Sequence, residues 1–164
     1  MTKTLLAAAA AIVATPALAS AQDLTLTVDP STGDISWDTT DAGVAGFTLT
    51  SASDRLVPAN FPYLAGSAAT GLYDFGGAFF SILSNTEGDM SGGTTGAGQV
   101  INNFNVAGMY APGSLTGSEI LADLNLVYAP SDGSNVTPGS IVLVPEPASL
   151  GLLGLAGLAL IRRR

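Results

Sequence analysis

In the middle of the chain, apolar and polar residues alternate over short stretches, which is the pattern of β-strands with one buried face. Residues 24–28 place two Leu and one Val on one face and two Thr on the other. The run Asp29–Asp34 that follows is rich in turn-forming residues, and strand-like sequence resumes at residues 35–37. We therefore predict that the two strands form a β-hairpin.

Four further segments are candidate strands. Residues 46–51 repeat the alternation, and residues 78–83 are apolar except for one Ser, which predicts a buried strand. Residues 99–104 are a weaker candidate, because several Asn residues lie in or beside them. The clearest candidate is Ile120–Tyr128, whose even-numbered positions are apolar while Asp123 falls on the opposite face. No segment in this part of the chain shows helical periodicity.

Turn-forming residues separate the later segments. Residues 131–134 lead toward a last strand at residues 140–144, which predicts a second hairpin with the strand before the turn. Residues 88–98 contain five glycines and predict a flexible surface loop; they lack the Lys-Ser/Thr pair of a phosphate-binding loop. About seven short strands predict an all-β fold, a single β-sandwich of Greek-key or jelly-roll-like type.

The N-terminus has the parts of a secretory signal peptide. A lysine near the start is followed by apolar residues 5–14 and then by a helix-breaking proline. Small residues follow, and Ala19 and Ala21 fit the Ala-x-Ala rule, which predicts cleavage by signal peptidase after Ala21. An overlapping site would cut after Ala19. The alternative is an uncleaved helix that anchors the N-terminus.

The C-terminus combines a rigid motif, a short apolar segment and a basic end. The motif is Pro145, Glu146 and Pro147; uncharged residues 148–161 follow, and the chain ends in Arg162, Arg163 and Arg164. As a helix, the apolar segment spans about 21 Å at ~1.5 Å per residue, less than the ~30 Å hydrocarbon core of a bilayer. The arginines favour the cytoplasmic side, which places the rest of the chain outside the inner membrane. These features predict transient insertion rather than a permanent anchor.

Together, these C-terminal features closely resemble the PEP-CTERM sorting signal of Gram-negative bacteria. The resemblance covers about the last 20 residues of the chain. It implies that an exosortase, a membrane enzyme, recognises and processes the chain at Pro145–Pro147. It also implies that the arginines are a retention signal and that the protein is associated with exopolysaccharide and biofilm matrix. The alternative is an ordinary C-terminal anchor on a membrane-tethered periplasmic domain.

The resulting organisation has three parts. Residues 1–21 are a signal peptide, residues 22–144 are the β-sandwich domain, and residues 145–164 are the sorting signal. The expected path runs through the secretion translocon to a transient inner-membrane intermediate, and from there to the cell surface or the extracellular medium.

Charge and composition exclude several classes of function for the central domain. The chain of 164 residues has no cysteine and no histidine, which excludes disulfides, Cys/His zinc sites and histidine-based catalysis. Residues 22–144 contain 12 acidic residues and a single base, Arg55, so we expect no binding to nucleic acid. Acid–base chemistry would depend on carboxylates alone.

A secreted carbohydrate-active enzyme would need two carboxylates as its catalytic groups. Candidate pairs are Asp38 with Asp41, and Glu87 with Asp89. Their positions in turn-rich sequence favour turn capping instead, so we predict a non-enzymatic protein. No cofactor is expected. Calcium is the one candidate ion, at the oxygen-rich turns of residues 29–34 and 132–135.

Sugar binding would need exposed aromatic rings. The aromatic residues in or near loop-like sequence are Trp37, Phe61, Tyr63, Tyr73, Phe75 and Tyr110. In a small β domain we expect most of these side chains to belong to the core.

Overall fold

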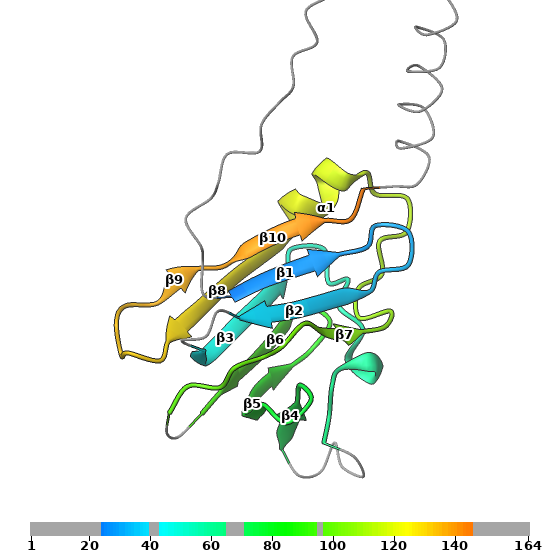
Figure 1. Ribbon diagram of the computed structural model, residues 1–164. Coiled ribbons are helices and arrows are strands. Elements are labelled where there is room, and N and C mark those ends of the chain that lie inside the picture. The colour runs from blue at the N-terminus through cyan, green and yellow to red at the C-terminus, as the bar shows by residue number, and fades with distance from the viewer. Residues whose placement is uncertain (1–23, 40–42, 65–70, 95–96, 146–164) are drawn as a thin grey trace, which may run out of the picture.

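The computed structural model describes residues 24–39, 43–64, 71–94 and 97–145. Within these ranges the chain forms two β-sheets and one α-helix, so the prediction of a mainly β chain is confirmed (Figure 1). The first sheet has the order β10-β1-β2-β7. Its strands are Leu24–Val28 (β1), Ile35–Thr39 (β2), Phe104–Val106 (β7) and Ser140–Leu143 (β10).

The second sheet has six strands in the order β4-β5-β6-β3-β8-β9. These are Val44–Ser51 (β3), Leu72–Asp74 (β4), Phe79–Asn85 (β5), Asp89–Gly93 (β6), Leu124–Pro130 (β8) and Thr137–Pro138 (β9). The α-helix is Gly117–Asp123 (α1), and a short 3-10 helix, Pro58–Asn60, follows β3.

The predicted first hairpin is confirmed. Strands β1 and β2 are antiparallel, with Leu24 opposite Thr39. The side chain of Asp29 closes the turn by accepting a hydrogen bond from the Ser31 backbone N–H at 2.8 Å. Gly33 has a φ of +76°, a value that glycine adopts with little strain. The local sequence therefore determines this turn.

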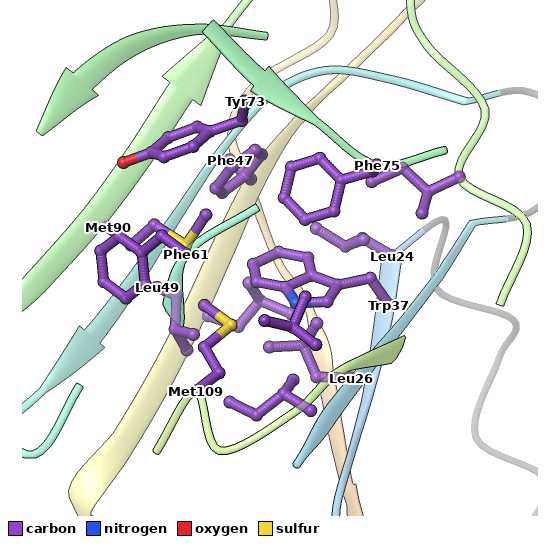
Figure 2. Packing of buried hydrophobic residues seen from close by; sticks show 14 of the residues in the cluster. Leu24, Leu26, Trp37, Phe47, Leu49, Phe61, Tyr73, Phe75, Met90 and Met109 are labelled. Carbon is purple, nitrogen blue, oxygen red and sulfur yellow. The ribbon is translucent and has the colours of Figure 1, made fainter. Parts of the chain in front are cut away.

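One hydrophobic core joins the two sheets. Trp37 of β2 lies 5.0 Å from Phe47 of β3 and 5.0 Å from Phe75, measured between ring centroids. Figure 2 shows these rings together with the apolar side chains of β1. Five of the six aromatic residues weighed for sugar stacking are buried, and Tyr63 is partly buried, so they form core as expected.

The predicted strand over Ile120–Tyr128 is wrong for its first four residues. These residues belong to α1, and β8 begins at Leu124. The helix starts with a capping box, in which the Thr116 N–H and the Glu119 carboxylate are hydrogen-bonded at 2.7 Å. As a result Asp123, expected on a polar face, is buried with 7% of its surface exposed.

The glycine-rich segment also differs from its prediction. Its first half is β6, which lies between β5 and β3 and buries Met90. Gly92 is needed for packing: a Cβ there would lie 3.0 Å from the Phe80 Cβ and 3.2 Å from the Phe47 ring. The neighbouring strand β5 is less buried than predicted, because Phe79 and Leu83 are 44% and 73% exposed.

The turn at residues 131–134 closes an antiparallel hairpin, but its second strand is β9 and not the predicted residues 140–144, because the chain changes sheets before them. β9 pairs antiparallel with β8, whereas β10 pairs parallel with β1 in the other sheet. The change falls at Gly139, where a Cβ would collide with the side chain of Leu126. The weak candidate at residues 99–104 forms only an isolated bridge from Gln99 to Val44, and β7 begins at its end.

Candidate functional site

The end of β10 lies next to the C-terminal motif. Leu143, the last residue of β10, is opposite Val28 at the end of β1. The Val144 N–H then donates a 2.9 Å hydrogen bond to the Val28 carbonyl. Pro145 follows and is exposed. Among the described residues, the bond from Val144 is the last one between this segment and β1, and it lies one residue before the motif.

β10 is only partly buried. Val142 and Val144 are 47% and 39% exposed, whereas Ile141 and Leu143 are partly buried and pack against the core. Leu143 also lies beside the start of α1, because a Cβ on Gly117 would come 2.8 Å from its Cδ1. Alternate side chains of this strand therefore face the core and the solvent, as expected for a strand with one buried face.

The surroundings of this strand end are acidic. Asp29 directly follows Val28, and hydrogen bonds from Ser31 lower the pKa of its carboxyl. At the start of α1, hydrogen bonds from Thr116 lower the pKa of Glu119. Both side chains therefore carry a negative charge at neutral pH.

Arg55 is the only base in residues 22–144. Its guanidinium Nη1 donates to the carbonyls of Ala111 at 3.0 Å and Pro112 at 3.2 Å. The Ala111 N–H in turn donates to the Arg55 carbonyl at 2.8 Å. The guanidinium of Arg55 is thus hydrogen-bonded to backbone carbonyls, and Arg55 joins the loop after β3 to the loop of Ala111 and Pro112.

A buried polar cluster is centred on Asp123. Its carboxylate accepts hydrogen bonds from the Ser51 hydroxyl at 2.7 Å, the Tyr110 hydroxyl at 2.8 Å and the Ser53 N–H at 2.8 Å. Burial alone raises the pKa of Asp123, but these hydrogen bonds together lower it below its usual value. Burial and the same carboxylate raise the pKa of Tyr110.

The cluster also includes the backbone of Arg55. The Ser51 hydroxyl donates to the ionised carboxylate of Asp123 and accepts a hydrogen bond from the Arg55 backbone N–H at 2.9 Å. Both hydrogen bonds hold the loop after β3 in place. The cluster ties the loop after β3 to the end of α1 and to the loop that holds Tyr110. These hydrogen bonds stabilise the packing of the two loops against α1.

Two of the other carboxylates considered from the sequence cap loops, whereas the Oδ1 atom of Asp89 is buried without a hydrogen-bond partner among the described residues. Asp38 accepts the Asn103 N–H at 2.9 Å, and its candidate partner Asp41 lies outside the described residues. At the turn of residues 132–135, Asp132 accepts the Ser134 N–H at 2.8 Å. No group of three or more acidic residues in the described ranges is placed to hold a metal ion.

The outer face of the second sheet carries a hollow of about 370 Å³. Its lining includes Phe79 and Ser81 of β5 together with Gln99, and no charged residue. Phe79 is the most exposed aromatic residue of the chain at 44%. A second, more apolar hollow of about 300 Å³ adjoins it and shares Gly93. Phe79 falls within residues 78–83, for which the sequence predicts a buried strand, so the sequence gives no sign of its exposed ring.

The C-terminal residues match a known family of sorting motifs. Residues 143–164 match the model of the PEP-CTERM protein-sorting motif. The chain therefore carries a signal of proteins that are exported, sorted at the membrane and processed by an exosortase-type enzyme. The resemblance seen in the sequence is confirmed, and the rest of the chain has no family assignment. No curated protein sequence and no solved structure is significantly similar to this chain.

The match also overlaps the folded domain. It begins at Leu143, the last residue of β10, and includes Val144, whose N–H is bonded to β1. Of the predicted processing residues, only Pro145 is described, and it lies at the surface.

The remaining predicted residues lie outside the described ranges. These are Glu146 and Pro147, the membrane stop Arg162, Arg163 and Arg164, and the signal-peptidase positions Ala19 and Ala21. Their roles stay predictions, as do the three domain boundaries. Among the residues that the structure does describe, no helix has the length and apolar character of a membrane span.

Proposed function

We propose that this chain is an exported, non-enzymatic β-sandwich protein that an exosortase-type enzyme cuts near Pro145–Pro147 and delivers to the cell surface or matrix. The observation that carries the proposal is the sorting-signal match that begins at the last residue of β10. Cleavage near Pro145–Pro147 would remove the apolar tail and its arginines and leave the ten strands of the described residues with the domain. The core shared by the two sheets supports the sandwich architecture.

The test compares processing of the wild-type chain with that of Glu146→Ala in the native host. Intact-mass analysis of the wild-type product should give a start at Gln22 and an end near the Pro-Glu-Pro motif. The variant should accumulate as precursor in the inner-membrane fraction. Release of Glu146→Ala at the wild-type rate, or a wild-type product that still ends in Arg164, would contradict the proposal.

The non-enzymatic part is supported by four of the described carboxylates. Asp29, Asp38 and Asp132 accept hydrogen bonds from backbone N–H groups of loops, and Asp123 is held in a buried cluster. The competing proposal, a carbohydrate-active enzyme, predicts hydrolysis of a polysaccharide that is lost on replacing one Asp or Glu. A panel of polysaccharides incubated with the mature protein distinguishes the two.

A second function, contact with a neutral polysaccharide, is favoured by the hollow at Phe79. An exposed aromatic ring can pack against the C–H face of a sugar, and Ser81 and Gln99 offer polar groups beside it. The Phe79 backbone N–H donates to the Gln99 Oε1 at 3.4 Å, which holds the amide of Gln99 against the backbone of the strand that carries the ring. The lining has no charged residue, so the hollow suits an uncharged polymer better than an anionic one.

The mature protein, purified from its host, would be tested for co-sedimentation with cellulose and for retardation by dextran. Phe79→Ala should abolish any retention, whereas Val142→Thr, on the other sheet, should leave it unchanged. Equal retention of Phe79→Ala and wild type, or no retention of wild type, would contradict this second function.

A further inference from the structure

We propose that β10 must separate from β1 before the sorting signal can be processed, so that pairing of these strands controls the rate of cleavage. This inference rests on the proposed processing near Pro145–Pro147. It adds Leu143 and Val144 as residues that determine processing through their place in the sheet.

The first argument is the overlap between fold and signal. The family match includes Leu143 and Val144. In the folded domain Leu143 packs against the core, and the Val144 N–H is bonded to the Val28 carbonyl. Enzymes that bind extended peptides use the same backbone groups that a sheet uses. These two residues therefore cannot occupy the sheet and an enzyme cleft at the same time.

The second argument is that β10 can leave while the sheet remains. It is an edge strand, and its pairing is with β1 alone among the described strands. β1 stays paired with β2 on its other side, and β2 with β7. Separation of β10 would therefore leave a three-stranded sheet (Figure 1).

The third argument is the position of the hinge. The Gly139 N–H donates to the Leu126 carbonyl at 2.9 Å, so residue 139 belongs to the second sheet while residue 140 belongs to the first. Residues 140–144 can thus separate as one unit from a fixed point. As an extended chain of five residues they add about 17 Å of reach at ~3.4 Å per residue. With β10 in place, Pro145 directly follows Val144, whose N–H makes the last hydrogen bond to β1 among the described residues.

A disulfide between β10 and β1 tests the proposal, because the chain has no cysteine of its own. Thr27 is opposite Val142 in the parallel pair, and neither side chain is buried. Neighbouring strands lie roughly 4.8 Å apart, within the range of Cα distances that a disulfide spans. The locked variant is Thr27→Cys with Val142→Cys.

The matched control joins two strands that need not separate. Thr27→Cys with Ser36→Cys shares one cysteine with the locked variant and connects β1 to β2, where Thr27 is opposite Ser36. Both variants are oxidised and presented to host membranes that contain the processing enzyme, and conversion to the mature form is followed by mass spectrometry. We expect the locked variant to convert at less than a tenth of the control rate, and reductant to restore it.

A loosened strand should have the opposite effect. Val142→Gly weakens an exposed position of β10, and Val142→Thr keeps the β-branched shape as its control. We expect Val142→Gly to be processed at least threefold faster than Val142→Thr. Equal rates for this pair, or conversion of the oxidised locked variant at the control rate, would overturn the inference. Glu146→Ala separates the two proposals: if it still blocks processing in that case, the sorting proposal stands and only the role of β10 fails.

Discussion

The first and last strands of the domain are neighbours, but they contribute very differently to it. Leu24, Leu26 and Val28 of β1 are fully buried, whereas Val142 of β10 is 47% exposed. β1 is paired on both sides and β10 on one. Because the strands are parallel, the start of β1 and the end of β10 lie at opposite ends of the sheet. The chain thus leaves toward the sorting signal from its less buried strand.

Because of this difference, we expect β1 to determine the stability of the domain and β10 to determine access to the sorting signal. The strand nearest the predicted signal-peptidase site is part of the core, so it must be in place for the domain to fold. The strand nearest the sorting signal adds one edge to a sheet that is already formed. A change in β10 can therefore alter access to the signal at a small cost in free energy of unfolding.

Replacement of a buried side chain in β1 should have the largest effect. Leu26→Ala removes a fully buried side chain that lies opposite Trp37 of the neighbouring strand β2, and it leaves a cavity. We expect a loss of about 3 kcal/mol in the free energy of unfolding. Urea denaturation of the mature protein, followed by tryptophan fluorescence, measures it. A loss below about 1 kcal/mol would show that β1 is less important to the core than its burial indicates.

Replacement of the buried carboxylate should have a comparable but slightly smaller effect. Asp123→Asn places an amide N–H₂ among donors from Ser51, Ser53 and Tyr110, so at least one buried donor loses its acceptor. We expect a loss of about 2 kcal/mol at neutral pH. The control is Asp132→Asn, on an exposed turn, which we expect to leave the midpoint of urea denaturation unchanged.

Stability should also depend on pH through Asp123. Its pKa is lowered in the folded protein, so its contribution is fully present above the unfolded value near 3.8 and is lost as the pH falls through the lower folded value. We expect the wild type to lose stability below about pH 4, and Asp123→Asn to lose less over the same interval. Parallel pH profiles for the two proteins would show that other carboxyls dominate acid unfolding.

The sequence predicted the elements whose structure depends on neighbouring residues. The hairpin of β1 and β2 follows from alternation and from a turn closed by Asp29 and Gly33. The sorting signal was found because its motif, apolar segment and arginines are consecutive. These signals need no knowledge of the rest of the fold.

Elements that depend on distant contacts were not predicted. Glycine is required at position 92 of a central strand because the Phe80 Cβ and the Phe47 ring, from the two neighbouring strands, occupy the space of a side chain. Gly139 marks a change of sheet that hydrophobic alternation cannot reveal. α1 is too short for periodicity to identify, although Thr116 and Glu119 at capping-box spacing were a usable signal.

The partner of Leu26 in β10 provides the direct comparison between the two strands. Ile141 is opposite Leu26, but it is only partly buried and lies on the edge strand. We expect Ile141→Ala to cost about 1 kcal/mol, well below Leu26→Ala, because less apolar surface returns to water. Both variants are measured in the same urea titration. Equal losses for the two would remove the distinction between a core strand and an edge strand.

The exposed face of β10 should be the least sensitive position. Val142→Thr keeps the β-branched shape that favours strands and replaces one methyl group that is largely in water. We expect a change within about 0.5 kcal/mol, which thermal unfolding would record as a nearly unchanged midpoint. A larger loss would mean that this face is covered in the mature protein, either by a second copy of the chain or by a partner. Repeating the measurement over a tenfold range of protein concentration distinguishes these, because only self-association makes the midpoint depend on concentration.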